Sequence, residues 1–202
     1  MSAETADGTQ KFYSSNAATY AQSGGEKISQ HLNRFLAELP ARARILELGC
    51  GGGRDAKALI AAGHDVEPTD GIPEIARQAE ELLGIPVKVL RFEELEARDA
   101  YDAIWANASL LHVARTALPD VLRRVRTALK PGGLHLATYK GGGQEGLDRH
   151  GRYFNYLTPD DVVQMYEHAG DWDIVSLVEY VEAGYDKDTP EPWTAIMVKK
   201  YR

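Results

Sequence analysis

Arg44-Ile45-Leu46-Glu47-Leu48-Gly49-Cys50-Gly51-Gly52-Gly53-Arg54-Asp55 is the stretch that decides the fold of this chain. The apolar run 45–48 is typical of a short strand that is buried on both faces, and it ends at Gly49. The glycines within 49–53 let the backbone turn sharply and bring bare peptide N–H groups against a ligand. A helix follows over residues 54–62, so its positive N-terminal end points at that ligand. The stretch therefore predicts a strand, a nucleotide-binding loop and a helix.

The spacing of the glycines indicates which nucleotide the loop holds. A dinucleotide loop needs glycines in the pattern G-x-G-x-x-G, and here Arg54 stands at the third of those positions. Asp70 ends the next predicted strand, where its carboxylate can accept hydrogen bonds from both hydroxyls of a ribose. These features favour a nucleoside without a pyrophosphate. Pro68 in the same strand predicts either a bulge or an early end of the strand, because proline lacks the N–H donor.

Three segments resemble one known family. Residues 47–55, Glu-Leu-Gly-Cys-Gly-Gly-Gly-Arg-Asp, resemble the first motif of the class I S-adenosylmethionine-dependent methyltransferases, specifically the branch of tellurite-resistance-type enzymes. Residues 101–107 with Leu111-His112-Val113 are similar to the family's fourth strand and its exit, and residues 129–133 to the turn into its fifth strand. The resemblance extends from about Phe12 to the end of the chain. It implies a doubly wound, Rossmann-like α/β fold with a seven-stranded sheet.

The hydrophobic pattern predicts strands and helices that alternate until the last two strands, 172–179 and 194–199. No helix separates this pair, so the last strand is expected to run antiparallel to the others. The other predicted elements are strands at 87–90 and 134–139, and helices at 28–39, 73–83 and 118–129 and after Thr158. The predicted organisation is a disordered polar tail at 1–10 and one domain at 11–202, made of a helical cover at 11–40, a cofactor half at 44–113 and a substrate-loop half at 114–202.

The resemblance implies that S-adenosyl-L-methionine is the cofactor and S-adenosyl-L-homocysteine its product. Arg91 stands where related enzymes usually present an acidic residue to the adenine amino group. That departure leaves two alternatives for the adenine contact, which are Phe92, through its ring or backbone N–H, and Glu93. The residues expected to bind the cofactor are Tyr20, Glu47, Gly49, Gly51, Gly53, Arg54, Asp70, Gly71, Ile72, Phe92, Glu93 and Asn107.

The segment 140–156 leaves the sheet at the edge where open α/β proteins bind ligands. A loop of this length more often binds a ligand than not, and the alternative is a mobile, solvated loop that binds none. A sulfonium methyl is already activated, so a thiolate acceptor needs no base, whereas an oxygen or nitrogen acceptor needs one and His112 is the catalytic candidate. The residues expected to contact the acceptor are Tyr13, His112, Lys140, Arg149, Arg152 and Tyr153.

Composition limits the other function classes. A net charge of −7 and a pI near 5.4 disfavour nucleic acid as a partner, because phosphates would be repelled over most of the surface. The single cysteine, Cys50, excludes an internal disulfide and a thiolate-rich metal site, and no metal is expected. No apolar run approaches the roughly 20 residues of a membrane span, and residues 1–10 lack the features of a signal peptide, so a cytoplasmic location is expected.

We therefore expect a methyltransferase (EC 2.1.1.-) that acts on a small molecule by in-line transfer, because no insertion is large enough to recognise a protein or RNA. The basic residues of segment 140–156 favour an anionic acceptor. Two alternatives stand beside this expectation. A non-catalytic S-adenosylmethionine sensor would keep every cofactor residue, and an NAD-dependent dehydrogenase would share the glycine loop but is disfavoured by Arg54.

Overall fold

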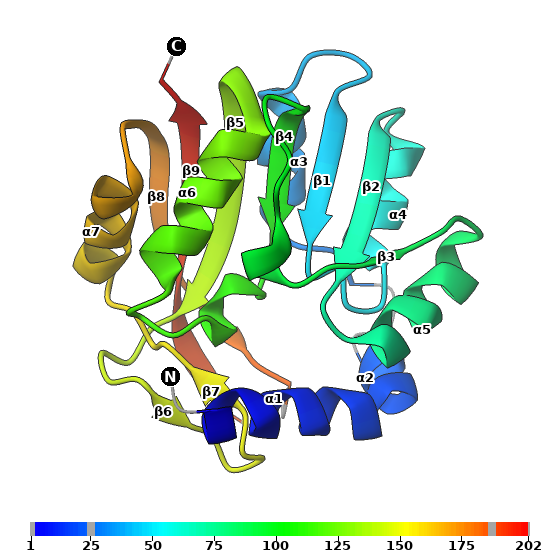
Figure 1. Ribbon diagram of the computed structural model, residues 1–202, viewed down its shortest axis with the longest axis vertical. Coiled ribbons are helices and arrows are strands. Elements are labelled where there is room, and N and C mark those ends of the chain that lie inside the picture. The colour runs from blue at the N-terminus through cyan, green and yellow to red at the C-terminus, as the bar shows by residue number, and fades with distance from the viewer. Residues whose placement is uncertain (1–2, 24–26, 186–188, 202) are drawn as a thin grey trace.

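Seven strands form one mixed sheet in the computed structural model, which describes residues 3–23, 27–185 and 189–201. Their order is β3-β2-β1-β4-β5-β9-β8, and β9 runs antiparallel to both of its neighbours while the pairs from β3 to β5 are parallel (Figure 1). The predicted seven-stranded, Rossmann-like sheet with an antiparallel last strand is confirmed. The strands are β1 (Arg44–Leu48), β2 (Asp65–Asp70), β3 (Lys88–Val89), β4 (Tyr101–Ala106), β5 (Leu129–Lys140), β8 (Trp172–Ala183) and β9 (Pro190–Lys200).

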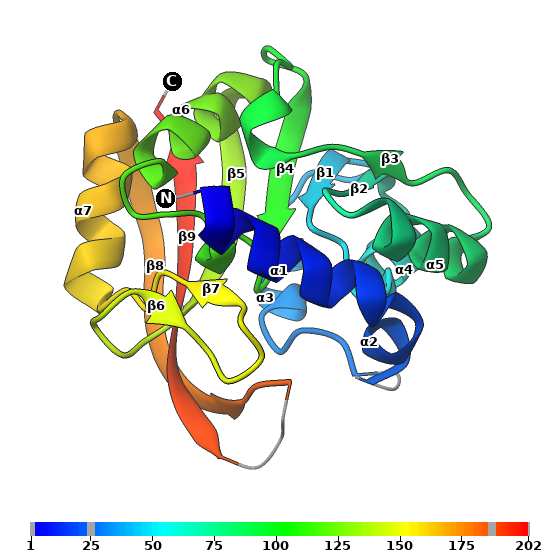
Figure 2. The same ribbon diagram turned by 60° about the horizontal axis from the view of Figure 1, so that its bottom comes forward.

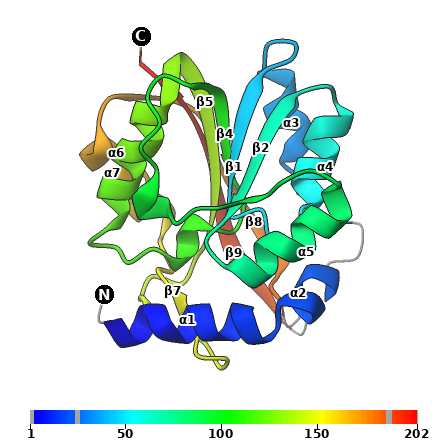
Figure 3. The same ribbon diagram turned by 45° about the vertical axis from the view of Figure 1, so that its right-hand side comes forward.

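Helices cover both faces of the sheet (Figure 3). One face carries α3 (Leu32–Ala37), α4 (Arg54–Ala61) and α5 (Pro73–Leu83), and the other carries α6 (Leu118–Ala128) and α7 (Pro159–Ala169). Buried aromatic residues fill both layers, with Phe35 against Trp105 on the first face and Tyr139 beside Tyr166 on the second. Two short 3-10 turns, η1 (Phe92–Glu94) and η2 (Leu110–His112), follow β3 and β4. Among the described residues, no helix is long and apolar enough to cross a membrane.

The N-terminal segment differs from the prediction of a disordered tail. Its residues from Ala3 onward form α1 (Ala3–Ser15), and α2 (Ala17–Ser23) follows after one residue. Figures 1 and 2 show α1 lying across the edge of the sheet at which β1 and β2 end. There the Thr9 hydroxyl accepts a hydrogen bond from the backbone N–H of Tyr153 at 2.8 Å. Tertiary contacts of this kind stabilise a helix whose own sequence has little apolar periodicity, so the local pattern did not reveal it.

Pro68 does not interrupt β2, so the predicted bulge or early end is wrong. β2 pairs with β1 in unbroken register from Asp65 to Thr69, and Pro68 lies opposite Glu47. On its other side β2 has a partner only from Thr69 onward, because β3 begins there. Pro68 therefore sits where β2 has a neighbour on one side only, and no second ladder loses a hydrogen bond.

Three other predicted boundaries change. The helix expected at 28–39 is confined to α3, and Ile28 is 41% exposed ahead of it. β5 begins at Leu129 rather than at 134, because the expected turn at 129–133 is part of the strand, beside a shift in register with β4. The segment 140–156 is not structureless, because β6 (Gly146–Leu147) and β7 (Tyr153–Phe154) pair within it as a short antiparallel hairpin.

Candidate active site

The glycine loop leaves β1 at the edge of the sheet crossed by α1. Gly49, Gly51 and Gly53 have φ angles of 77°, 54° and 80°, a left-handed conformation that costs little only for glycine. A Cβ atom on Gly49 would lie 2.5 Å from the Cβ of Ser109, so no side chain fits between the loop and the end of β4. Gly53 instead faces Leu83 and Ala79 of α5, and it is the N-cap of α4.

Asp70 joins the loop after β1 to the loop after β2. Its Oδ2 accepts a hydrogen bond from the Gly51 N–H at 3.1 Å, and its Oδ1 accepts one from the Ile72 N–H at 2.9 Å. Burial raises the pKa of Asp70 to about 6, although these two hydrogen bonds act in the opposite direction. The side chain is thus a rigid acceptor at the carboxyl end of β2.

Asp70 faces a cavity of 140 Å³, here called the inner cavity. Ser109, which the sequence analysis missed, also lines it, and its buried hydroxyl has no hydrogen-bond partner among the described residues. Of the two alternatives for the adenine contact, Phe92 lines the inner cavity, whereas Glu93 is exposed outside it. The predicted cofactor residues that line the inner cavity are Tyr20, Gly49, Gly51, Asp70, Gly71, Ile72 and Phe92.

Glu47 and Asn107 line a second space of 170 Å³ that the glycine loop also borders, here called the loop cavity. Glu47 is only 3% exposed, and its Oε2 has no hydrogen-bond partner within the described part of the chain. Burial raises the pKa of Glu47 well above its usual range, and the nearby carboxylates of Asp55 and Asp70 raise it further. A buried acid with an unpaired oxygen fits a cationic or hydrogen-donating group of a ligand.

Asp55 is a site residue that the sequence analysis missed. Its Oδ2 accepts hydrogen bonds from Trp105 Nε1 at 3.0 Å and from Asn107 Nδ2 at 3.1 Å, and its Oδ1 accepts one from the Ser29 N–H. An acid in the first turn of a helix is ordinarily explained by the helix dipole, so its position gave no separate signal. Asp55 fixes the orientation of the Asn107 amide at the end of β4.

Arg54, at the position of the missing third glycine, ties the N-terminal cover to the loop. Its Nη1 donates a hydrogen bond to the Ala21 carbonyl of α2 at 2.8 Å. The arginine lines both the loop cavity and a larger outer cavity. A side chain of this length would interfere with a dinucleotide loop, but here it brings α2 over the glycines.

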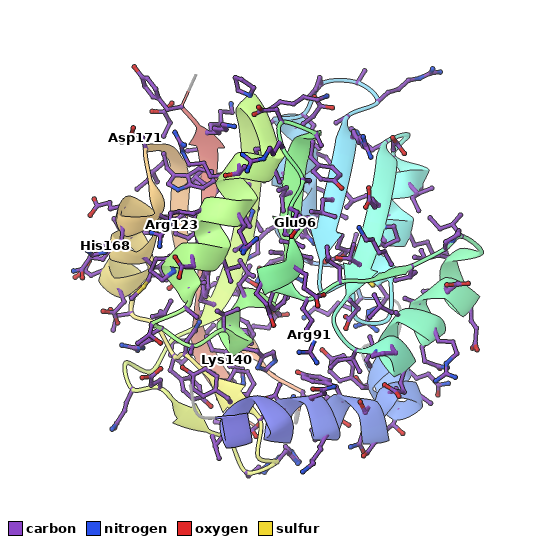
Figure 4. All side chains as sticks on the ribbon, in the orientation of Figure 1. Arg91, Glu96, Arg123, Lys140, His168 and Asp171 are labelled. Carbon is purple, nitrogen blue, oxygen red and sulfur yellow. The ribbon has the colours of Figure 1, made fainter. Side chains whose placement is uncertain are left out.

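The outer cavity, of 490 Å³, is enclosed by aromatic and basic side chains. Within the described lining, Lys27, Arg54, Lys140 and Arg152 are cationic and only Glu182 is acidic, although the chain as a whole carries a charge of −7. The carboxylates that pair with Lys140 and Arg152 are Glu191 and Asp148, neither of which is among the lining residues. In Figure 4, Lys140 lies near α1 at the lower edge of the sheet. The aromatic residues that line the cavity are Tyr13, Tyr20, Phe154, Tyr180, Tyr185 and Trp193.

His112 lines both the inner and the outer cavity, as does Tyr13. Its Nδ1 lies 2.6 Å from the carbonyl oxygen of Tyr153, and its Nε2 lies 2.8 Å from the hydroxyl of Tyr13. Because a carbonyl only accepts, Nδ1 carries the proton, and Nε2 accepts a hydrogen bond from the Tyr13 hydroxyl. Burial lowers the pKa of His112 to about 4, so the ring is neutral at physiological pH.

The predicted acceptor residues fall into two groups. Tyr13, His112, Lys140 and Arg152 come together around the outer cavity. Arg149 is exposed and lies outside the cavity, and Tyr153 is turned away from it, because its hydroxyl donates to Glu145 while its carbonyl holds His112. Three further aromatic residues of the cavity, which the sequence pattern did not indicate, come from β8, the residues after it and β9, namely Tyr180, Tyr185 and Trp193. Aromatic residues in or beside strands are typical of a core, so their pattern did not distinguish a cavity wall.

Comparisons with known proteins agree with this geometry. A family model described as a methyltransferase domain matches residues 19–182. A ubiquinone biosynthesis O-methyltransferase of Xanthomonas axonopodis pv. citri is 34% identical over 110 residues, which are 49% of this chain and 44% of that protein. The chain thus aligns with less than half the length of this curated relative.

Two solved structures have the same fold. The 1,6-didemethyltoxoflavin-N1-methyltransferase of Burkholderia thailandensis, solved with 1,6-didemethyltoxoflavin and S-adenosylhomocysteine, has a TM-score of 0.75 at 19% identity, covering 98% of this chain and 89% of that one. A SAM-dependent methyltransferase from Methanosarcina mazei has a TM-score of 0.74 at 17% identity, covering 87% of this chain and 99% of that one. At these identities the likeness supports the fold alone.

Proposed function

The chain belongs to the class I S-adenosylmethionine-dependent methyltransferase family, and from this premise we propose that it methylates a small anionic molecule bound in the outer cavity. S-adenosylmethionine is the cofactor, and when bound it supplies an activated sulfonium methyl group. The family match decides against the NAD-dependent alternative. Membership of the tellurite-resistance-type branch is part of the proposal, and its support is the Gly53-Arg54 pair that ends the glycine loop.

The residues present fit this cofactor in three respects. Gly49 and Gly51, in left-handed conformations, place backbone without a side chain beside the inner cavity, as a close-fitting nucleoside requires. Their N–H groups are not the bare donors that the sequence predicted, because Gly49 donates to the Thr69 carbonyl at 2.9 Å and Gly51 donates to Asp70. Asp70 provides a carboxylate for the ribose hydroxyls at the carboxyl end of β2. The unpartnered Oε2 of Glu47 in the loop cavity suits the ammonium group of the amino-acid end, because a buried carboxylate is stabilised by an opposite charge.

The observation that carries the proposal is that the inner and outer cavities share a wall made of Tyr13, Tyr20, Ala108 and His112. A cofactor in the inner cavity and an acceptor in the outer cavity would therefore meet at that wall. Methyl transfer from a sulfonium needs little more than this approach, an aligned acceptor and the exclusion of water. α1 and α2 contribute to the exclusion of water, because Tyr13 of α1 and Tyr20 of α2 line both cavities, and Figure 2 shows the two helices lying across this end of the sheet.

The charge of the outer cavity supports an anionic acceptor. Lys140 is almost fully buried, with its Nζ 4.7 Å from the centre of the Phe154 ring, and the Arg152 guanidinium lies 5.2 Å from the centre of the same ring. Lys140 and Arg152 each pair with a carboxylate, Glu191 and Asp148, but neither carboxylate lines the cavity, so the side of each pair that faces the cavity is the cation. The acceptor's negative group would therefore bind near Phe154, beside His112.

Release of S-adenosylhomocysteine, measured across pairs of small acceptors that differ only in a carboxylate and its amide, tests the proposal. We expect turnover to favour the carboxylates, and Lys140→Met to raise KM for them more than it lowers kcat. Lys130→Met is the matched control, because Lys130 pairs with Asp102 at the opposite end of β4. Activity confined to protein or RNA, or a preference for the amides, would contradict the proposal. Tight cofactor binding without turnover of any acceptor would instead support a sensor.

A further inference from the structure

We propose that Tyr13 and His112 form a proton relay, in which the Tyr13 oxygen takes the proton of the acceptor's hydroxyl or N–H group while His112 takes the proton of Tyr13. This inference rests on the proposed methyl transfer and narrows its substrate class. It requires an acceptor whose reacting oxygen or nitrogen carries a hydrogen, rather than a thiolate.

The inference rests on the position of Tyr13 and His112. Tyr13 and His112 both line the inner and the outer cavity, so they stand where a methyl group would cross between cofactor and acceptor. The Tyr13 hydroxyl is 2.8 Å from Nε2 of His112, within the distance for direct proton transfer. Both ring nitrogens of His112 already have partners, Nδ1 the Tyr153 carbonyl and Nε2 the Tyr13 hydroxyl, so the Tyr13 oxygen is the atom of the pair that can take a proton from the acceptor.

The protonation state of His112 is fixed from its other side. Its Nδ1–H donates to the Tyr153 carbonyl at 2.6 Å, which leaves Nε2 as the nitrogen that can gain a proton. The charged groups that act on the ring are Lys140 of β5 and Arg152, which lower its pKa, and Asp148, which raises it. Burial is the largest cause, and it outweighs Asp148 and the Tyr153 hydrogen bond, so the pKa of His112 falls to about 4 and Nε2 is unprotonated near neutral pH.

The atoms and electrons of the step balance. A lone pair of the acceptor oxygen forms the new bond to the methyl carbon, and the electrons of the breaking carbon–sulfur bond remain on sulfur. The acceptor O–H bond breaks as its hydrogen moves to Tyr13 Oη, and the original Tyr13 proton moves to Nε2. An oxygen that gains a methyl group becomes strongly acidic, so a weak base is sufficient at that moment. The imidazolium then returns its proton to solvent when the product leaves.

A matched pair of acceptors separates this role from a purely structural one, in which the hydrogen bond only braces α1 against η2. The probes are 4-hydroxybenzoate and 4-mercaptobenzoate, because the thiol is ionised near neutral pH and has no proton to give. We expect Tyr13→Phe and His112→Gln each to lower kcat for the hydroxyl probe by at least about tenfold, since general base catalysis typically contributes 10²–10⁴. Both variants should keep kcat for the thiol probe within about twofold, and the double variant should lose little more than either single one.

Tyr101→Phe is the control, because the Tyr101 hydroxyl bonds Glu67 at the other end of β4. Equal losses with both probes, no loss with the hydroxyl probe, or methylation of the thiol probe alone would overturn the relay. Calorimetry with S-adenosylmethionine tests the underlying proposal separately, because the relay variants should still bind the cofactor if it is correct.

A second measurement does not depend on turnover of either probe. In ¹⁵N-histidine NMR spectra of the full chain with S-adenosylhomocysteine, His112 should be protonated on Nδ1 only and remain neutral down to pH 5. The Nε2 resonance should shift in Tyr13→Phe and be absent from His112→Gln, which assigns it. Protonation on Nε2, a titration midpoint near 6.5, or a resonance that Tyr13→Phe leaves unchanged would refute the relay even if both acceptor probes were inert.

Discussion

Replacing Asp70 by asparagine should weaken cofactor binding without destabilising the fold at neutral pH. Burial raises the pKa of this carboxyl from 3.8 to about 6, and one pKa unit corresponds to about 1.4 kcal/mol, so its ionisation costs the folded state roughly 3 kcal/mol at pH 7. Asparagine removes that cost. It also loses one acceptor for the N–H groups of Gly51 and Ile72, which costs about 1–3 kcal/mol. The two changes nearly cancel at pH 7.

The sign of the pH dependence follows from the raised pKa. A carboxyl with a higher pKa in the folded state contributes stability below pH 3.8 and loses that contribution as the pH rises through about 6. Asp70→Asn lacks this dependence, so the stability of the variant relative to wild type should rise between pH 4 and pH 7. Urea unfolding of the cofactor-free protein at four pH values measures the difference.

The affinity of the wild type for the cofactor should rise with pH, whereas the contribution of Asp70 to folding stability falls. If only the ionised carboxylate binds the ribose, a group with a pKa of about 6 predicts about tenfold weaker binding of S-adenosylhomocysteine at pH 5 than at pH 7. Isothermal titration calorimetry on the wild type measures this change, and Asp70→Asn should bind weakly at both pH values. An affinity that stays constant from pH 5 to pH 7, or a variant that binds as tightly as wild type, would refute the role given to Asp70.

Two further predictions concern stability. Burial lowers the pKa of His135 to about 4, below its usual 6.5, so the fold should lose about 2 kcal/mol between pH 7 and pH 5 from this residue, and urea unfolding of His135→Asn should lack that loss. Gly49→Ala should cost about 2–4 kcal/mol and abolish calorimetric binding of S-adenosylhomocysteine, because its Cβ would lie 2.5 Å from Ser109 in a left-handed backbone. Gly63→Ala, with a φ of 89° and nothing within 4 Å, should cost only about 1 kcal/mol and leave binding intact. Equal effects of the two alanines would show that backbone strain, and not the contact with Ser109, determines the loss.

The sheet and the cofactor edge followed from the sequence because their signals are local. The decisive features lie within 26 residues of one another: the apolar run 45–48, the glycines and the acid at the end of the second strand. Each of them indicates the local backbone conformation without reference to the rest of the chain. The antiparallel β9 followed from the absence of a helix before it. Pro68 was misjudged because its effect depends on where β3 begins, which only the register of the sheet reveals.

The acceptor side was less predictable because tertiary contacts build it. The cavity combines Tyr13 of α1, Phe154 of β7 and Trp193 of β9, which are far apart in the chain. Tyr153 and His112 were both selected from the sequence, yet only the structure reveals that the former contributes its backbone carbonyl and not its ring. Arg149 and Arg152 are indistinguishable by type, but one is exposed and the other is buried on Asp148.

The cover formed by α1 and α2 has a consequence for the order of events in a catalytic cycle. Tyr13 and Tyr20 border both cavities, and Arg54 fastens α2 to the glycine loop. A displacement of these helices wide enough to release the spent cofactor would also expose the neighbouring compartment to bulk water. Departure of the methylated product and renewal of the methyl donor would then take place through one opening of the protein.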